Sequence, residues 1–458
     1  MGCSLAYHLA RGGRKVVVID RGKIGQGATA ACAGGIRAQF STEVNIRIGM
    51  EAKRVLAHFV EETGQSADFR QVGYLFLLTT HEERQRFADN VRLQRRLGLE
   101  DVVELAPAEA RAMVPGLRTD DLSGATFCPS DGLAGPNEVT YGYANAARRL
   151  GAVILEDTPL DGFLTAGGSV RGIKTAASEI ACADTVICAG PWSAPVGAML
   201  GLTLPIEPSR RQVFVSEGFA GIGRRSPMTI DFHTSFYFHP EGEGVLFGMS
   251  DPATPPGDDT SVDWSLLDRI TAVAERRWPP LLDARVKSAW AGLYENTPDS
   301  QPLIGPLRPG LWIAAGFSGH GFMMAPVIGR WLASWMTGTA PTADLPAPSS
   351  PSATWCNGRR LAARGPSPGS RRRPQCVRRT SCWARPLTAG RSRRRPRDFD
   401  EDLPGPSRGQ PSSRSVRRDP RGDPESRADA APRGLHHRAI GARRNRAPGG
   451  REAPPVRQ

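Results

Sequence analysis

The sequence predicts an α/β fold in which one domain is assembled from segments far apart in the chain. Residues 2–19 have the pattern of a helix followed by a continuous apolar strand, and residues 185–192 that of a second buried strand entering a glycine turn. A third strand, at 311–315, leads through a glycine-rich loop into a helix. Residues 211–249 alternate as sheet strands do, so sheet-forming insertions separate the pieces of the first domain.

The opening unit has the pattern of a dinucleotide-binding βαβ unit without its first strand. Gly2 begins a helix with one apolar face, Gly12-Gly13 end it in the left-handed conformation that glycine tolerates, and Val16–Ile19 form a strand buried on both faces. Asp20 ends that strand. In such units the helix N-terminus faces a pyrophosphate, and an acid after the second strand accepts hydrogen bonds from a ribose.

Gly2 takes the place of the third glycine of G-x-G-x-x-G, so the other two glycines and the preceding strand are expected upstream of Met1. We therefore expect an N-terminal truncation, or a start assigned at an internal methionine. The alternative is a helix and a strand that meet by chance in another α/β protein. The small-residue run Gly25–Gly35 allows close backbone approach to a ligand and favours the dinucleotide interpretation.

Length and cysteine usage narrow the class of protein. The 458 residues suffice for two domains and a large core. The eight cysteines form no C-x-x-C pair and no His/Cys cluster with zinc spacing, which predicts no metal site and favours a reducing, cytoplasmic location. No signal peptide is evident, and the uncharged stretches 185–206 and 309–329 are too broken by Gly and Pro to indicate membrane spans.

The chain changes character near Leu345. Residues 346–458 contain 27 Arg, no Lys and nine acidic residues. Their net charge of +18 exceeds the +13 of the whole chain, so the remainder carries −5 and the basic balance says nothing about its ligand. The composition predicts a disordered tail. A nucleic-acid-binding arm is the alternative, but the scarcity of aromatic residues and of Lys favours inert disorder or a shifted reading frame.

Helices and strands alternate through the middle of the chain. Helices are predicted at 42–62, 82–97, 137–150, 262–277 and 325–336. Strands are predicted at 72–79, 153–155, 159–164, 185–189, 211–216, 235–238, 244–249 and 311–315, with a hairpin from 170–175 and 180–183. Residues 124–136 and 293–304 are predicted to be turn-rich.

Five motifs follow one another along residues 1–345. They are Gly2…Asp20, Gly27-Ala28-Thr29 through Gly34-Gly35-Ile36-Arg37, Val186 to Trp192, Asn296-Thr297-Pro298-Asp299, and Gly316 to Phe322. In this order they resemble the D-amino-acid oxidase/sarcosine oxidase family of FAD-dependent oxidoreductases, of the glycine-oxidising and sarcosine oxidase β-subunit type. The resemblance implies a discontinuous FAD-binding Rossmann-type domain and a substrate domain whose large mixed sheet roofs the flavin.

The resemblance also implies a set of cofactor contacts. Asp20 resembles the acid that holds the adenosine ribose, and Leu160 matches a position whose backbone contacts the adenine. The segment Gly319–Phe322 matches the loop at the pyrimidine end of the flavin, where a helix dipole would stabilise the anionic reduced ring. The expected cofactor-binding residues are Gly2, Asp20, Arg21, Thr29, Gly34, Gly35, Leu160, Gly190, Gly319, His320, Gly321 and Phe322.

Three residues are candidates for the reaction itself. Arg37 matches an arginine that grips the substrate carboxylate in sarcosine oxidases, a task that suits a guanidinium fork; the alternative is a structural arginine. Tyr237 matches a tyrosine above the flavin, and its alternative is an ordinary core aromatic. His320 is expected near the flavin rather than as a base, with a purely loop-shaping role as the alternative.

The chain departs from that family at three positions. Met323 stands where monomeric sarcosine oxidases have a second carboxylate-binding lysine, and Gly292 where they have the cysteine that attaches FAD covalently. Leu246 stands where a lysine promotes reaction with oxygen. We therefore expect non-covalent FAD and a different grip on the substrate, and both an oxidase and a dehydrogenase remain open.

The implied function is FAD-dependent oxidation of the amine of a small or N-methylated amino acid, similar to sarcosine, glycine or proline, by hydride transfer to flavin N5. The alternatives are a non-catalytic FAD-binding subunit or assembly factor, and a chain made inactive by defects at both ends. We expect a small amino acid as partner, no specific nucleic acid, and leave partner subunits open. The expected domains are FAD-binding at 1–75, 140–210 and 290–345, substrate-binding at 76–139 and 211–289, and the tail at 346–458.

Overall fold

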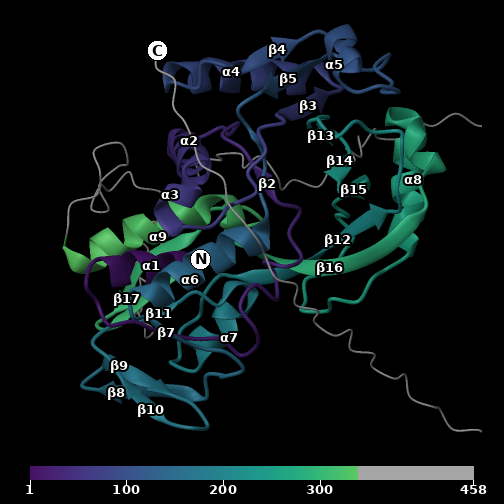
Figure 1. The fold of residues 1–458 in the computed structure, drawn as a ribbon. Helices are drawn as coiled ribbons and strands as arrows, with labels where there is room; N and C mark the ends of the chain where they lie inside the picture. Colours follow the sequence, from purple (N-terminus) through teal and green to yellow (C-terminus); the bar gives the residue numbers. More distant parts are fainter. Residues whose placement is uncertain (339–458) are drawn as a thin grey trace, which may run out of the picture. The chain divides into compact units, whose positions relative to one another are not determined.

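The structure, a computed structural model, describes residues 1–338, so the predicted tail at 346–458 lies outside the described residues. Helices and strands alternate through the described part (Figure 1), which confirms the α/β class. Two regions stand out in it: one large mixed sheet, and a group of helices packed on shorter parallel strands. Within residues 1–338, no helix has the length and apolar character needed to cross a membrane.

An eight-stranded sheet has the order β16-β12-β15-β14-β13-β3-β5-β4. Its neighbouring strands run antiparallel except β13 and β3, which are parallel. That pair joins two separate chain segments into one sheet. The strands are β3 (Tyr74–Leu78), β4 (Val103–Leu105), β5 (Gly124–Cys128), β12 (Glu207–Ser216), β13 (Met228–Asp231), β14 (Tyr237–Glu241), β15 (Gly244–Gly248) and β16 (Val286–Asn296).

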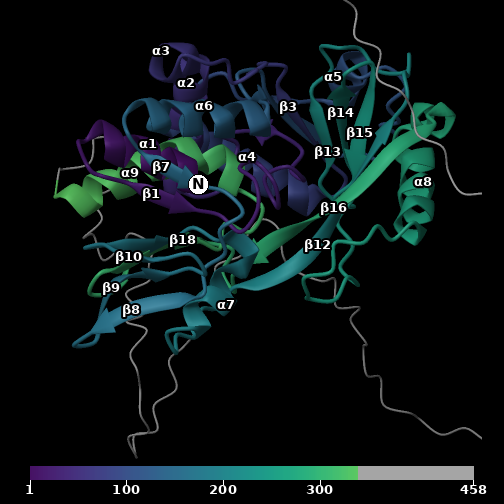
Figure 2. The same ribbon diagram turned by 60° about the horizontal axis from the view of Figure 1, so that its bottom comes forward.

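The two faces of this sheet have different neighbours. Leu75, Phe214 and Phe247 belong to the apolar cluster shared with α5 (Pro107–Met113) and α8 (Ser265–Arg277), and α8 covers the sheet on that side (Figures 1 and 2). Since side chains alternate along a strand, the residues next to these point to the opposite face. We call that opposite face the site face; it carries Tyr74, Phe76, Arg211, Tyr237 and Tyr294.

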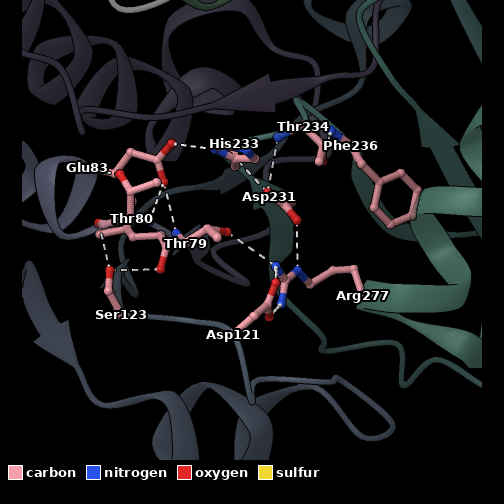
Figure 3. Close-up of polar contacts among 11 residues, drawn as sticks. Thr79, Thr80, Glu83, Asp121, Ser123, Asp231, His233, Thr234, Phe236 and Arg277 are labelled. Carbon is pink, nitrogen blue, oxygen red and sulfur yellow. Dashed lines mark hydrogen bonds and ion pairs between the residues drawn. The ribbon is translucent and has the colours of Figure 1, made fainter. Parts of the chain in front are cut away.

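A buried arginine at the end of α8 binds the last residue of β13, an interior strand of the sheet (Figure 3). Arg277 donates from Nε to Asp231 Oδ2 at 2.7 Å and makes a two-pronged contact with Asp121, at 2.6 and 3.0 Å. Asp231 also accepts the backbone N–H groups of His233 and Thr234. Because a buried charge is tolerated only when paired, this network specifies where α8 ends on the sheet.

Shorter parallel strands form the second region. β1 (Val17–Ile19) pairs with β7 (Val153–Leu155), and β11 (Thr185–Ile187) with β18 (Leu311–Ala315), which also pairs with the antiparallel β17 (Leu303–Arg308). Helix α1 (Gly2–Arg11) contacts α6 (Pro136–Arg149) and α9 (Gly321–Thr337). The other elements are β2 (Gly35–Ile36), β6 (Gly132–Leu133), β8 (Gly162–Ala166), β9 (Ser169–Lys174), β10 (Glu179–Ala181), α2 (Glu43–Ala57), α3 (Phe59–Thr63), α4 (His81–Arg96), α7 (Ser193–Ala198), and the short 3-10 turns Gly190–Trp192 and Pro279–Asp283.

Most predicted elements are confirmed, with ends shifted by a few residues, and β9 and β10 form the predicted hairpin. The prediction that the first strand is buried on both faces is wrong, because Val17 is 45% exposed. Within the described residues β1 has a paired neighbour on one edge only, which leaves its side chains partly open. The left-handed residue after α1 is Gly13, with φ +76°, whereas Gly12 has φ −80°.

Two turn predictions are wrong in part. Residues 293–304 were expected to be a polar turn, yet β16 continues to Asn296 and β17 begins at Leu303. The expected turn at 124–136 contains β5 and β6. In both cases cross-strand pairing outweighs the local turn propensity of Gly, Pro and Asn.

Helices α1 and α9 approach closely at Gly329. Ser4 Oγ donates to Ala325 O at 2.8 Å, and a Cβ on Gly329 would lie 2.2 Å from that hydroxyl and 2.8 Å from Leu5 N. One of these atoms belongs to the backbone, which cannot rotate away. The glycine therefore sets the distance between the two helices.

We predict that Gly329→Ala lowers the free energy of unfolding by about 1–3 kcal/mol, because a methyl group forced into a packed contact displaces the helix. Urea denaturation at pH 7.5 measures the change. Gly162→Ala is the matched control, since a Cβ there meets nothing within 4 Å. Equal stability of the two variants would contradict the prediction.

Candidate functional site

Arg37 is a buried guanidinium directly after β2, with only 4% of the residue exposed. Its Nη1 donates to Gln39 O, and its Nη2 lies 3.1 Å from His320 Nε2. Its Cζ lies 3.9 Å from the Phe40 ring centroid and 5.6 Å from that of Phe76. The structure places Arg37 between aromatic rings and a histidine, and its role at the substrate carboxylate stays a prediction.

His320 precedes α9 as its N-cap residue and is neutral in the fold. Burial, followed by the positive charge of Arg37, lowers the pKa of His320 to about 3. Because a guanidinium can only donate, Nε2 of His320 accepts from Arg37 and the ring proton sits on Nδ1. The ring edge also faces Phe40, with centroids 5.3 Å apart. This geometry is consistent with the expectation that His320 does not act as a base, which stays a prediction.

Three tyrosines of the site face lie around this pair. Burial raises the pKa of Tyr74, Tyr237 and Tyr294, so all three phenols stay protonated at neutral pH. A Cβ on Gly248 would lie 2.5 Å from Tyr237 Oη, which shows that this phenol leans over β15. Tyr237 also packs on the cluster that contains Phe76. The site face thus offers uncharged phenols and aromatic rings.

A buried ion pair fixes the segment that carries Arg37. Asp131 is 0% exposed, and its Oδ1 accepts from Lys53 Nζ at 2.8 Å and from Ala38 N at 2.9 Å. Its Oδ2 accepts from Gln39 Nε2 at 3.2 Å. Burial opposes the charge of Lys53, but Asp131 and its neighbours outweigh burial and raise the pKa of the amine. One carboxylate therefore holds the two residues that directly follow Arg37, Ala38 through its backbone N–H and Gln39 through its side-chain amide.

The segments expected at the cofactor contain glycines in the left-handed backbone conformation, which favours glycine. Gly34, Gly190 and Gly319 have φ of +72°, +52° and +88°. A Cβ on Gly34 would lie 2.6 Å from Ala134 O, and one on Gly319 2.4 Å from the Tyr294 ring. A side chain at these positions would be strained, so the chain at these points presents bare backbone.

The start of α1 lies beside the carboxyl end of β11, since a Cβ on Gly2 would contact Cys188 Cβ at 3.7 Å. Asp20, after β1, accepts the backbone N–H of Gly22 at 3.0 Å, and its charge acts on the nearby Cys3. Arg21 stacks over Trp192 at 4.0 Å. The structure thus gathers the ends of both parallel strands at the N-terminus of one helix, the arrangement that favours a nucleotide.

The remaining predicted residues are distributed more widely. Thr29 accepts the backbone N–H of Cys32, and Gly35 lies in β2 where Tyr74 Oη approaches it. Leu160 is half-buried before β8, while Phe322 packs against the helical core. Gly321 begins α9 close to the Glu295 carboxylate.

Several residues at the site were not predicted from the sequence. They are Lys53, Asp131, Arg211, Tyr294 and Glu295. The Glu295 carboxylate accepts from Gly316 N at 2.8 Å, and burial raises its pKa. A lysine on the buried face of α2 is the one local sign that the sequence offered, because such a charge demands a partner. Which acid pairs with it depends on strands far along the chain.

The comparison with protein families decides the class. The family model described as "FAD dependent oxidoreductase", DAO, matches residues 1–335.

The chain belongs to this family. As an FAD-dependent oxidoreductase it confirms the cofactor and the enzyme class expected from the motifs. Sarcosine dehydrogenase from Homo sapiens is 28% identical over 363 residues, which cover 75% of this chain but 39% of that protein. The chain thus spans about two fifths of the length of that relative. Glycine oxidase from Geobacillus kaustophilus is 27% identical and covered to 89%, against 73% of this chain.

A solved structure agrees with the fold. L-proline dehydrogenase from P. horikoshii has a TM-score of 0.69 and 34% sequence identity, and the match covers 74% of this chain and 90% of that one. The fold with the large mixed sheet and the helical region on shorter strands is therefore shared with that L-proline dehydrogenase.

The residues present fit FAD. The missing side chains at Gly34, Gly190 and Gly319 leave room for a ligand to approach the backbone. Helix α9 begins at Gly321, and the free N–H groups of its first turn can bind a negatively charged part of a ligand. Gly292 has no side chain to bond a flavin, and a Cβ there would lie 2.5 Å from Ala31 Cβ. That crowding favours non-covalent binding, which stays a prediction. No group of residues in the described part of the chain could hold a metal ion.

We predict that Lys53→Met destabilises the fold by about 3–5 kcal/mol, because it leaves the buried Asp131 carboxylate without its cation. Thermal or urea unfolding measures this. Lys23→Met is the control, since Lys23 pairs with Asp157 in solvent and its loss should change little. If the two variants unfold alike, the buried pair does not organise the site.

We predict that His320 makes the fold sensitive to acid. In the unfolded state the His320 ring is protonated below about pH 6.5, whereas in the folded state it is protonated only below about pH 3. The free energy of unfolding therefore falls as the pH falls from 6.5 to 3. At pH 4.5 the loss from this ring should reach up to about 3 kcal/mol. His320→Gln should flatten the dependence in urea titrations at pH 7.5 and 4.5, whereas exposed His81→Gln should not.

Proposed function

We propose that the chain oxidises the amine of a small or N-methylated amino acid similar to sarcosine, glycine or proline. The observation that carries the proposal is Arg37: a buried guanidinium held beside a neutral histidine, next to segments that fit the flavin. Sarcosine dehydrogenase, glycine oxidase and L-proline dehydrogenase among the similar proteins support this substrate class. FAD, when bound, supplies the acceptor for the hydride.

The chain's own residues would bind and orient the substrate. Arg37 would hold the carboxylate through paired N–H donors, because a fork matches a carboxylate in both geometry and charge. His320, neutral and proton-bearing at Nδ1, would keep the fork in place without adding charge. Phe40 and Phe76 would exclude water, which strengthens the ionic contact. Tyr237, which is expected above the flavin, would donate a hydrogen bond from its phenol to the bound substrate.

Within the described residues no base needs to act at the reacting carbon if the amine arrives neutral. Activity should therefore rise with pH until the substrate amine is deprotonated. The division into FAD-binding and substrate-binding segments, the cytoplasmic location and the choice between oxygen and another acceptor stay predictions.

The alternative is a non-catalytic FAD-binding subunit or assembly factor. The chain covers only 39% of human sarcosine dehydrogenase, so the activity of that whole protein is not carried over with the match. Flavin absorbance separates a chain that binds FAD from one that does not. Bleaching of that absorbance under anaerobic conditions by sarcosine, glycine or proline separates an enzyme from a binding subunit.

We predict that Arg37→Ala raises KM for the carboxylate substrate by about thirty- to a thousandfold, equivalent to ~2–4 kcal/mol, because a buried charged hydrogen-bond partner is lost. Steady-state kinetics with flavin content checked by absorbance measures it. Arg21→Ala, which removes an arginine stacked on Trp192, should leave KM for the amino acid near wild type. An unchanged KM in Arg37→Ala with FAD still bound would make Arg37 structural.

A further inference from the structure

Arg211 is a second arginine on the site face of the eight-stranded sheet. It lies on β12, where Phe214 points into the opposite apolar cluster, so alternation places Arg211 on the site face. Its cross-strand partner is Gly292 on β16. A Cβ on Gly292 would lie 2.5 Å from Ala31 Cβ. This end of the site face therefore contacts the small-residue loop 25–35, which is expected to lie at the flavin.

Only part of the Arg211 guanidinium is hydrogen-bonded to the described residues. Nη1 donates to Arg210 O at 2.8 Å, while Nε is buried and has no hydrogen-bond partner among the described residues. In that same part of the chain no carboxylate pairs with it. The neighbouring Arg210, on the other face, behaves differently, because it pairs with Asp259 at 2.6 Å. Since a guanidinium has five N–H donors, Arg211 keeps donors for a ligand.

Tyr294 connects Arg211 to the Arg37 pair. Arg211 Cζ lies 5.0 Å from the Tyr294 ring centroid, and the same ring fills the space where Gly319 would carry a side chain. His320 follows Gly319 directly and accepts from Arg37. Burial raises the pKa of the Tyr294 phenol, and the positive charges of Arg211 and Arg37 oppose that rise. Although its phenol is buried enough to raise the pKa, Tyr294 as a whole residue is 38% exposed, so part of it is open to a ligand.

We propose that Arg211 anchors a second carboxylate of the substrate while Arg37 holds the first. The proposal rests on the proposed function and narrows its substrate class to amino acids with two carboxylates. Two cations joined by an aromatic bridge repel each other unless an anion reaches each of them, and a dicarboxylate supplies both. The amine between the two carboxylates would then lie over Tyr294. Arg211 is thus a specificity-determining residue rather than a second copy of Arg37.

A matched pair of ligands tests this in the full-length chain. Thiodiacetate and (methylthio)acetate carry sulfur in place of the amine nitrogen, so neither forms an imine, and they differ by one carboxylate. Dissociation constants come from isothermal titration calorimetry, with flavin absorbance recorded in parallel. Wild type should bind thiodiacetate about ten- to a hundredfold more tightly, as a charged hydrogen bond at a desolvated site implies.

Arg211→Met should remove that preference and leave (methylthio)acetate binding unchanged, whereas Arg211→Lys should keep part of it through its charge. Arg210→Met is the control that should keep all of it. Equal affinity of the two ligands in wild type, no binding of either ligand, or equal weakening of both in Arg211→Met would overturn the proposal. If the preference is present but no amine bleaches the flavin, the proposed oxidation fails while the two-carboxylate site stands.

Discussion

The Lys53–Asp131 pair is the interaction on which the rest of the candidate site depends. A buried carboxylate requires a cation and hydrogen-bond donors, and here Lys53, Ala38 N and the Gln39 amide supply them. Those donors come from α2 and from the two residues that follow Arg37. The contacts that neutralise Asp131 therefore also fix the backbone next to Arg37. The position of Arg37 in the site thus depends on the pairing of a buried carboxylate.

Two buried arginines, Arg37 and Arg277, are likewise positioned by their hydrogen-bond partners. Arg37 is held beside a histidine whose pKa burial lowers, so the guanidinium gains a hydrogen-bond acceptor without a second positive charge beside it. Arg277 is held by Asp121 and Asp231 on the opposite side of the eight-stranded sheet (Figure 3). Arg277 thus holds the end of α8, and Arg37 is the residue proposed to bind the substrate carboxylate.

The positions that set this chain apart from monomeric sarcosine oxidases have physical consequences. Met323 packs in the helical core at 7% exposure, so the position of a second carboxylate-binding lysine supplies an apolar side chain instead. Gly292 leaves no group for a covalent flavin bond. Arg211, across the strand pair from Gly292, provides a positive charge from a different element. We therefore expect this chain to bind a substrate carboxylate with a positively charged side chain, as those oxidases do, but from a different position.

The sequence by itself determined the α/β class, the order of most elements and the family, because periodicity and glycine-rich motifs are local properties of the chain. It singled out Arg37 and His320 but not that one donates to the other, since their contact joins residues 283 positions apart. The roles of Asp131 and Arg211 depend on which strands pair and which face each residue takes. Cross-strand pairing also turned the expected turn at 293–304 into the end of β16, so only the tertiary structure decided where Tyr294 would stand.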